Sequence, residues 1–373
     1  MDYDTAERYS TKAMHVVTIL GTRPEIIRLS RIIPALGNVF QHTLVHTGQN
    51  YDYELNNIFF DGMKIQEPDY FLRATRVGDI IDKSYDLLKE LKPDAVLILG
   101  DTNSSLSAYA AKRLKIPVFH LEAGNRCFDE RVPEENNRKI VDHISDINLP
   151  YSQLARENLL REGLPADRTI VVGSPMYEVL NHYNYYIEIS QVLQRLDISH
   201  GHYFLVSAHR EENVDDPKRL NDFIHLLNNL ATTWGYPVVV SVHPRTRLKL
   251  EGLLTFHPLV KLLKPLGFFD YVKLQKCAKS VLSDSGSISE ESAILSFPGI
   301  NLRDTHERAE AMEYAAVVMT GMNWDNIQMA LNLKRPGVNI PAYCIPNVAQ
   351  KVVRIIASYT DYVNRVVWRK YDS

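Results

Sequence analysis

"VTILGTRPEII", residues 17–27, decides the fold class. An apolar run of strand length ends at Gly21, and Arg23 and Pro24 stand where a helix should begin. Proline suits the first turn of a helix, and an arginine beside it can donate two hydrogen bonds to phosphate oxygens. The stretch therefore predicts a strand, a tight turn and a helix, although a turn with an ordinary surface arginine is the alternative. G-x-G-x-x-G is absent here, which argues against a dinucleotide site.

The same alternation continues along the chain. Apolar runs are separated by longer amphipathic stretches over HVVTIL (15–20), HTLVHT (42–47), DAVLILG (94–100), PVFHLE (117–122), DINLPY (146–151) and TIVVG (169–173). The second half repeats the rhythm in HYFLVSA (202–208), PVVVSVH (237–243), VKLLKPL (260–266), SVLSDS (280–285), PGINLR (298–303) and AVVMTG (316–321). Strands that alternate with helical stretches predict parallel sheets flanked by helices.

The length of 373 residues, 45% of them hydrophobic, is enough for two cores. We therefore expect an α/β protein with two doubly wound, Rossmann-like domains that face a cleft. The first domain should comprise residues 1–175 together with a C-terminal helix, 360–373, that packs back on it, and the second residues 176–359. A free amphipathic end is the alternative for the C-terminal segment.

Composition limits the class of protein. Formal charge is −3, from 42 basic and 45 acidic residues without long blocks of one sign, so we expect no nucleic-acid partner. Cys127, Cys277 and Cys344 have neither metal-ligand nor redox spacing, which predicts no metal site and suits a reducing cytoplasm. The polar N-terminus is unlike a signal peptide, and no stretch reaches the roughly 18 apolar residues of a membrane span. A soluble, cytoplasmic protein without membrane insertion is expected.

Carboxylates follow neighbouring strands of the first half. Asp101 ends VLILGD, Glu122 ends VFHLE, and Glu134 follows in RVPEENNR. Each alone is more typical of a helix cap or an ion pair, but three on one rim favour acid–base chemistry. His209 ends a strand of the second half and should point toward the same cleft, unless it joins a surface ion pair.

A turn in the second half resembles a phosphate cradle. Ser285, Gly286 and Ser287 lie between a predicted strand and helix, where small side chains expose backbone N–H groups. Ser287 and Glu290 also fit a capping box, which would explain part of the motif without a ligand. That box leaves Glu291 unexplained.

Two further residues have open interpretations. His243 follows PVVVSV and either ends a strand or lines the nucleotide side of the cleft. Tyr271 in KPLGFFDY could stack on a base, although Phe268, Phe269 and Tyr271 together are also typical of a core. We include His243 and Tyr271 among the candidate nucleotide-binding residues.

Taken together, the motifs resemble the non-hydrolysing UDP-N-acetylglucosamine 2-epimerases, a family with the two-domain GT-B architecture. The resemblance rests on GTRPE (21–25), GD (100–101), HLEAG (120–124), PEENNR (133–138), SAHREEN (207–213), HP (243–244), DSGSISEE (284–291) and RDTHERAEA (303–311), which occur in the order found in the family. The stretches 46–53, 122–143 and 264–271 are most similar to the branch that makes UDP-N-acetyl-L-fucosamine from UDP-2-acetamido-2,6-dideoxy-L-talose for surface polysaccharides, such as capsule or O-antigen.

The resemblance implies roles for the candidate residues. The catalytic residues would be Asp101, Glu122, Glu134, His209 and Arg23; the UDP-binding residues would be Ser285, Gly286, Ser287, Glu291, Tyr271, His243 and Arg308. The family usually has a glycine where Ser287 stands, and its E-R-P-E motif reads Glu-Arg-Ala-Glu at 307–310, so the loop can differ in stiffness. A homodimer is also implied.

The residue types suit an elimination. A base removes the proton at C2 while UDP leaves C1, and a second group returns the proton to the opposite face before UDP re-adds. This route needs several carboxylates and neither a nicotinamide nor a metal, so we expect no cofactor. The alternatives are the same reaction on UDP-N-acetylglucosamine, which gives UDP-N-acetylmannosamine, a GT-B glycosyltransferase, and a catalytically silent nucleotide-sugar binder.

Overall fold

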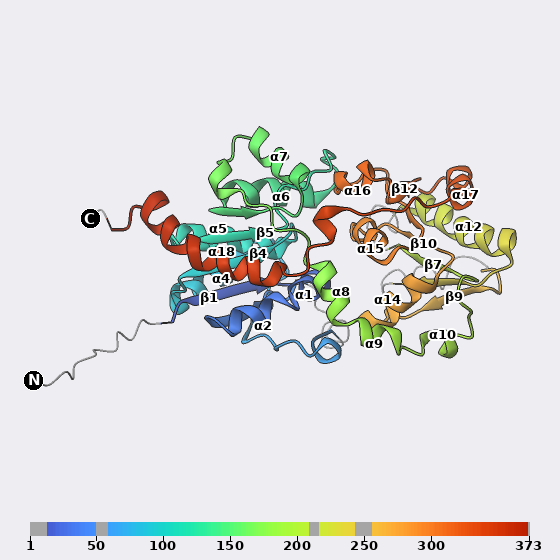
Figure 1. Ribbon diagram of the computed structural model, residues 1–373, viewed down its shortest axis with the longest axis horizontal. Helices are drawn as coiled ribbons and strands as arrows, with labels where there is room; N and C mark the ends of the chain where they lie inside the picture. The colour runs from blue at the N-terminus through green and yellow to red at the C-terminus, as the bar shows by residue number, and fades with distance from the viewer. Residues whose placement is uncertain (1–12, 50–58, 209–215, 243–255, 372–373) are drawn as a thin grey trace, which may run out of the picture.

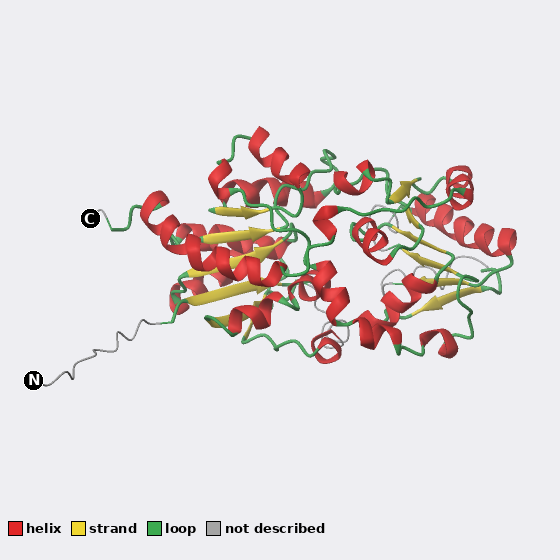
Figure 2. Ribbon diagram, in the orientation of Figure 1, coloured by secondary structure: helices red, strands yellow, loops and turns green. Residues whose placement is uncertain are grey.

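The computed structural model describes residues 13–49, 59–208, 216–242 and 256–371. Two α/β units lie side by side, each with its own sheet and helices on both faces (Figures 1 and 2). Every strand pair is parallel. The predicted fold class, two doubly wound domains of the GT-B type, is confirmed.

The two sheets have the same topology. The first is ordered β3-β2-β1-β4-β5-β6 and the second β12-β11-β10-β7-β8-β9, so in each sheet the first strand pairs with the fourth. The strands are β1 (His15–Leu20), β2 (Gln41–His46), β3 (Tyr70–Phe71), β4 (Ala95–Leu99), β5 (Val118–Leu121), β6 (Ile147–Leu149), β7 (Phe204–Ser207), β8 (Val238–Ser241), β9 (Val260–Leu263), β10 (Ser280–Ser283), β11 (Gly299–Asn301) and β12 (Val317–Met319). The strand order reverses between β1 and β4 and between β7 and β10, and ligands of such sheets bind at the carboxyl ends of those strands.

Helices cover both faces of each sheet. They are α1 (Arg23–Leu29), α2 (Ile32–Gly37), α4 (Val77–Leu91), α5 (Ser107–Arg113), α6 (Pro133–Ile144), α7 (Gln153–Arg161), α8 (Met176–His182), α9 (Asn184–Glu188), α10 (Val192–Arg195), α12 (Pro217–Trp234), α14 (Phe268–Cys277), α15 (Ile288–Leu295), α16 (Ala309–Glu313), α17 (Trp324–Asn332) and α18 (Val348–Tyr362). Short 3₁₀ turns span Asn103–Leu106, Ala166–Arg168 and Pro341–Tyr343, and a π-helical turn spans Val363–Val367. No helix of the described ranges combines the length and the apolar character that crossing a membrane requires.

Strand prediction differs from the structure at two places. β3 has only two residues, both exposed, and too short a pattern to be recognised. The stretch 169–173 forms no strand, because only Thr169 makes a β-bridge. Its backbone still follows β6, since Ile170 and Val172 donate to the carbonyls of Asn148 and Pro150 at 2.9 Å.

The C-terminal segment returns to the first sheet. α18 crosses back from the second unit and lies along the first, near α2 (Figure 1). Val352 and Ile356 of α18 are fully buried in the same core as Val16 and Leu29. Beyond the helix, the Lys112 ammonium lies 4.8 Å from the centre of the Trp368 ring. The exact residue limits of the two domains remain a prediction.

We predict that Ile356→Ala destabilises the protein by about 2–5 kcal/mol, because it leaves a cavity in the first core. Urea unfolding followed by circular dichroism measures the change. Ser358→Ala on the exposed face of the same helix is the control and should change stability by less than about 0.5 kcal/mol. Equal effects of the two variants would mean that α18 does not contribute to this core.

Candidate active site

The candidate residues gather at the carboxyl ends of the strands where each sheet reverses its order. Arg23 follows β1 and Asp101 follows β4 in the first sheet, while the turn 285–287 follows β10 in the second. The helices that start there direct backbone N–H groups toward the same region. Ion pairs join the two units in this region, from Arg28 to Glu290 and from Arg308 to Glu122, so both domains contribute to it.

Glu25 fixes the turn after β1. Its carboxylate accepts hydrogen bonds from the N–H groups of Gly21 and Thr22, at 2.6 and 2.9 Å, and from the Thr102 hydroxyl at 2.5 Å. Burial raises the pKa of Glu25 to about 7, although these donors oppose the shift. Glu25 thereby ties the turn after β1 to the loop after β4, and it sets the start of α1, whose first residue is Arg23.

Arg23 faces the second domain. Its guanidinium lies 5.5 Å from the centre of the Phe59 ring and interacts electrostatically with Tyr271 and Glu291. Burial lowers the pKa of Arg23, and the two groups of the second domain oppose that shift. Burial and then Glu291 raise the pKa of Tyr271 to about 12. The structure therefore brings together three predicted site residues from two domains.

The nucleotide-side residues are held by neighbours in the second domain. The Tyr271 hydroxyl lies 3.3 Å from the Ser207 hydroxyl, at the end of β7. Gln275 donates a 2.5 Å hydrogen bond to Glu291, whose pKa is raised by burial. Tyr271 and Glu291 are half-buried and so remain partly accessible, whereas Gln275 is buried.

The turn 285–287 is compact. The hydroxyls of Ser285 and Ser287 lie 3.0 Å apart, and the Ser287 N–H donates to the Ser285 hydroxyl at 3.3 Å. A Cβ built on Gly286 would lie 1.9 Å from Oε1 of Glu307, so a side chain at this position requires Glu307 to move. Glycine therefore allows a carboxylate of the same domain to lie against the turn.

The capping-box interpretation of Ser287 and Glu290 is wrong. Ser287 is the N-cap of α15, but its side chain makes no capping hydrogen bond. Glu290 is instead fully buried and accepts hydrogen bonds from Arg28, at 2.9 Å, and from the Ser174 hydroxyl. This pairing prevails over the cap because a buried arginine left without its partner costs about 3–5 kcal/mol.

Glu122 lies between two arginines, one from each domain. Its Oε1 accepts a 2.7 Å hydrogen bond from Arg308, and its Oε2 lies 3.4 Å from Nε of Arg28. Arg308 is also 3.7 Å from Glu290. We call these four residues, Arg28, Glu122, Glu290 and Arg308, the interdomain cluster. None of their side chains is more than 11% exposed.

The backbone at Glu122 is strained. Its φ of 70° lies in the left-handed region, which costs a residue with a side chain roughly 1–3 kcal/mol. The Glu122 N–H nevertheless donates to the Leu149 carbonyl at 3.1 Å, and the two arginines fix the carboxylate. Strain that the surroundings maintain in this way is typical of functional positions.

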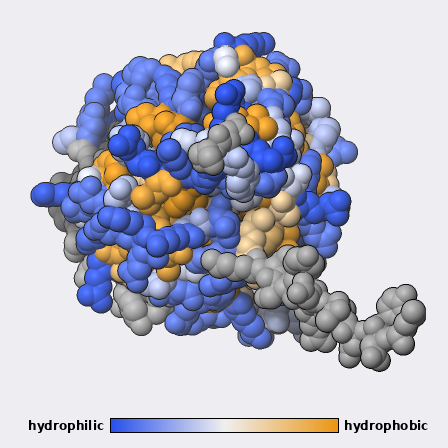
Figure 3. Space-filling view, turned by 90° about the vertical axis from the view of Figure 1, so that its left-hand side faces the viewer, coloured by the Kyte–Doolittle hydropathy of each residue, from blue (hydrophilic) through white to orange (hydrophobic). Residues whose placement is uncertain are grey.

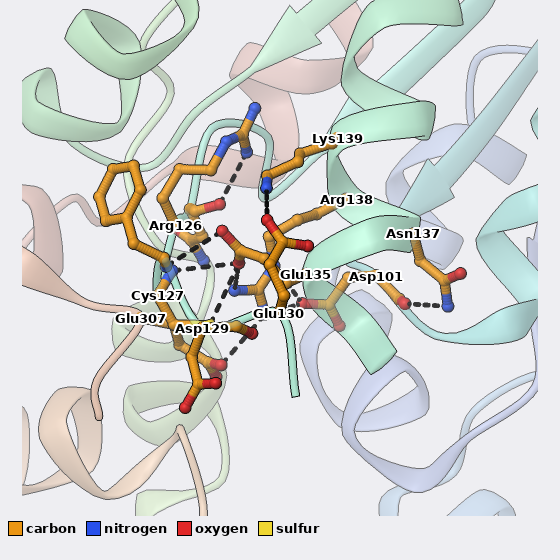
Figure 4. A network of polar contacts seen from close by, with 12 residues as sticks. Asp101, Arg126, Cys127, Asp129, Glu130, Glu135, Asn137, Arg138, Lys139 and Glu307 are labelled. Carbon is orange, nitrogen blue, oxygen red and sulfur yellow. Dashed lines mark hydrogen bonds and ion pairs between the residues drawn. The ribbon is translucent and has the colours of Figure 1, made fainter. Parts of the chain in front are cut away.

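Asp101 is held by an arginine of its own domain. Arg138 donates to Oδ2 of Asp101 from Nε, at 3.0 Å, and from Nη2 (Figure 4). Burial raises the pKa of Asp101; Arg138 opposes the shift, whereas the nearby Glu307 and Glu122 add to it. The effect of Glu122 on the pKa of Asp101 indicates that the two predicted catalytic carboxylates are electrostatic neighbours.

The adjacent glutamates at the start of α6 differ. Glu134 is half-buried and makes no hydrogen bond or ion pair to Asp101 or Glu122 among the described residues. Glu135 is fully buried and accepts from the N–H groups of Cys127 and Phe128, both at 3.1 Å. These bonds and Arg138 lower the pKa of Glu135 although burial alone raises it, so this carboxylate is structural.

The structure does not test the predicted roles of Arg308, His209 and His243. Arg308 belongs to the interdomain cluster, and its contact with UDP remains a prediction. His209 and His243 lie outside the described residues. No group of three or more His, Cys, Asp or Glu side chains within the described ranges is arranged to hold a metal ion.

The sequence did not indicate that Arg28 and Arg138 hold the carboxylates, and it assigned Arg308 to UDP rather than to Glu122. Arg28 lies between apolar neighbours of α1, and these are the local signal of a buried charge, although Glu25 is buried on the same helix. Arg138 and Glu307 lie inside motifs that had been recognised, PEENNR and RDTHERAEA, without a role. Their partners are distant in sequence, so no spacing rule could identify the pairs.

The protein has two Rossmann-like sheets, each of which reverses its strand order once. A compact turn and several carboxylates lie at the carboxyl ends of the strands where this reversal occurs. This arrangement defines a nucleotide-sugar protein of the GT-B type. Residues 35–357 match the family model described as UDP-N-acetylglucosamine 2-epimerase. The chain therefore belongs to that family, and it is an isomerase, a UDP-sugar 2-epimerase.

Known proteins are similar over nearly the whole chain. The solved structure of UDP-N-acetylglucosamine 2-epimerase from Rickettsia bellii is 44% identical, with a TM-score of 0.89, and the match covers 95% of this chain and 99% of that one. The enzyme of Methanocaldococcus jannaschii, solved in complex with UDP-GlcNAc and UDP, is 34% identical with a TM-score of 0.86, and covers 92% and 99%. A UDP-2,3-diacetamido-2,3-dideoxy-D-glucuronate 2-epimerase from Pseudomonas aeruginosa is 34% identical over 84% of this chain and 90% of its own.

We predict that Glu290→Ala lowers the free energy of unfolding by about 3–5 kcal/mol, because it leaves Arg28 and Arg308 with one carboxylate between them. Denaturant unfolding at neutral pH measures the loss. The matched control is Glu90→Ala on the exposed face of α4, which should change stability by less than about 0.5 kcal/mol. A Glu290→Ala protein as stable as wild type would contradict this account of the interdomain cluster.

Proposed function

We propose that this protein inverts C2 of a UDP-2-acetamido sugar by elimination and re-addition of UDP. The observation that carries the proposal is the pair of partly buried, neighbouring carboxylates, Asp101 and Glu122, in the region of a turn suited to a diphosphate. Such a reaction needs one group that takes a proton and another that returns it, and two carboxylates of different surroundings supply both.

The proposed reaction has two stages, elimination of UDP and its re-addition. A carboxylate takes the C2 proton, the C–H electron pair forms the C1–C2 double bond, and the C1–O bond breaks with its electrons on UDP. A second acid then gives a proton to the opposite face of C2, and UDP re-adds to C1. Asp101, Glu122 and Glu134 are the proposed proton carriers, without an assignment of each to one face.

Other residues would stabilise the leaving group. Negative charge develops on the diphosphate as the C1–O bond breaks, and donors already in place stabilise it. Arg23, at the start of α1, and the turn 285–287 would serve this role, and we include His209 with them. Glu291 would bind the ribose hydroxyls and Tyr271 would lie beside the uracil, with His243 and Arg308 on the UDP side.

For the substrate, we propose UDP-2-acetamido-2,6-dideoxy-L-talose, converted to UDP-N-acetyl-L-fucosamine for a surface polysaccharide such as capsule or O-antigen. The stretches 46–53, 122–143 and 264–271 support this choice. UDP-N-acetylglucosamine is the second candidate, because the similar enzymes of Rickettsia bellii and Methanocaldococcus jannaschii are named for it. A glycosyltransferase is the alternative of another class, and it would require an acceptor.

We also propose a cytoplasmic homodimer. Tyr85 on α4 and Tyr109 on α5 are exposed by 36% and 47%, and these two helices pack against each other. Apolar patches interrupt the hydrophilic surface at the end of the molecule formed by the first domain (Figure 3). Exposed apolar surface of this kind supports an interface between two copies.

We predict that incubation with the correct UDP-sugar in deuterated water, without an acceptor, places deuterium at C2 of the product and later of the recovered substrate. Oxygen-18 in the bridge between C1 and the β-phosphorus should move into non-bridging positions, because UDP leaves. Mass spectrometry and NMR follow both labels for the two candidate sugars. Turnover that depends on an acceptor would indicate a transferase, and C2 exchange with a retained bridge label would contradict elimination.

We predict that Asp101→Asn, Glu122→Gln and Glu134→Gln each lower turnover by at least about 100-fold, the lower limit for a positioned acid or base. Initial rates of C2 exchange measure the effect, and circular dichroism checks the fold. Glu130→Gln is the control, because Glu130 is exposed and forms a surface ion pair with Lys139. Near-normal rates in all three variants would refute the catalytic assignment.

A further inference from the structure

Glu307 of the second domain reaches the arginine that holds Asp101. Arg138 donates from Nη2 to Oε2 of Glu307 at 3.1 Å, and the same nitrogen donates to Asp101 (Figure 4). Arg138 is only 3% exposed at its side chain and Glu307 only 11%. The two carboxylates belong to different domains, so this contact exists only while the domains lie together.

The second oxygen of Glu307 lies at the nucleotide turn. Oε1 occupies the space that a Cβ on Gly286 would fill, at 1.9 Å from that position. Its Oε2 is also 3.1 Å from Nη1 of Arg303, an arginine of its own domain. Glu307 therefore spans the distance between the turn proposed for the diphosphate and the arginine of a proposed proton carrier.

Glu307 competes with other carboxylates for the Arg138 guanidinium. One guanidinium serves three carboxylates, since Arg138 also donates to Glu135 at 2.8 Å. Charged hydrogen bonds in a buried site depend strongly on how many partners compete for the donor. A glutamate that approaches from the other domain draws part of the positive charge of Arg138 away from Asp101.

We propose that Glu307 is a positioning residue that acts on Asp101 through Arg138 and prepares it for proton transfer when the domains close around a nucleotide. This inference rests on the proposed epimerase function. The anionic diphosphate of a UDP-sugar at Gly286 would repel the Glu307 carboxylate from the turn and hold it against Arg138, so that binding of the nucleotide is passed on to the acid–base site.

The charged surroundings of Asp101 fix the direction of the effect. Arg138 lowers the pKa of Asp101, while burial, Glu307 and Glu122 raise it. Glu135 also accepts a hydrogen bond from Arg138, and Arg303 offsets part of the negative charge of Glu307. Removing the charge of Glu307 leaves more of Arg138 to Asp101, and the pKa of Asp101 should fall.

The test is Glu307→Gln, which keeps the shape of the side chain and removes its charge. We expect kcat to fall by about 10- to 100-fold, the effect of one lost charged hydrogen bond, with the limb of the pH profile that belongs to Asp101 displaced to lower pH. The Kd for UDP, measured by calorimetry, should not rise, because a negative charge beside the diphosphate turn has been removed. In an Asp101→Asn protein, the same change should cause no further loss.

Glu313→Gln, on the exposed face of α16, is the matched control and should match wild type in every measurement. A Glu307→Gln protein with weaker UDP binding, a lower melting temperature and an unmoved pH profile would overturn the proposal, because those changes describe a purely structural contact. Losses that simply multiply in the double variant with Asp101→Asn would also overturn it.

Different measurements test the proposed function and the role of Glu307. Wild-type protein that exchanges no C2 proton on either UDP-sugar refutes the proposed function. The pKa of Asp101 can still be read without turnover, by carbon-13 NMR of labelled aspartate carboxyls assigned with Asp101→Asn. A lower pKa in Glu307→Gln than in wild type supports the link between the two residues, and an equal pKa refutes it.

Discussion

The structure depends on four buried charges at the junction of the two domains. Arg28 and Glu122 come from the first domain, and Glu290 and Arg308 from the second. Each charge would be costly to bury alone, because the loss of its hydration exceeds what any single neutral contact returns. The two shortest pairs of the cluster, Arg28 with Glu290 at 2.9 Å and Arg308 with Glu122 at 2.7 Å, each join one domain to the other. The interdomain cluster therefore fixes how the domains meet and, at the same time, holds a proposed catalytic carboxylate in a strained conformation.

The position of the cluster follows from the topology. Both sheets reverse their strand order between the first and fourth strands, and the loops at those points diverge to opposite faces. Side chains that follow β4, β5 and β10 consequently share one region, and Phe268 and Val272 of the second domain also pack in the core of the first. Glu25 makes this region rigid on the first side, since its carboxylate joins the turn after β1 to the loop after β4.

The sequence could predict local features, namely the strands and the residues at their ends. Eleven of the twelve predicted apolar runs coincide with strands because parallel strands are buried on both faces and read as continuous apolar stretches. The positions of Arg23, Asp101, Glu122 and Ser285 at strand ends followed from the same rule. The pairs that hold these residues could not be predicted: Arg28 and Glu290 are 262 positions apart. Glu290 shows the difficulty, because a correct local pattern for a cap was overridden by a distant arginine that the pattern does not contain.

The two proposed proton carriers of the first domain have different charge environments. Glu122 faces two arginines, whereas Asp101 shares a single arginine with Glu135 and Glu307. Burial and two neighbouring carboxylates raise the pKa of Asp101, so it holds a proton more readily than an exposed aspartate does. Different charge environments of the two carboxylates suit epimerisation, because a proton must leave one face of C2 while another is added to the opposite face. The second domain supplies Arg308 to one carboxylate and Glu307 to the arginine of the other, from adjacent positions of one loop. The contact between the domains therefore gives the two carboxylates different charged neighbours: Glu122 gains a cation, whereas Asp101 gains a competitor for its arginine.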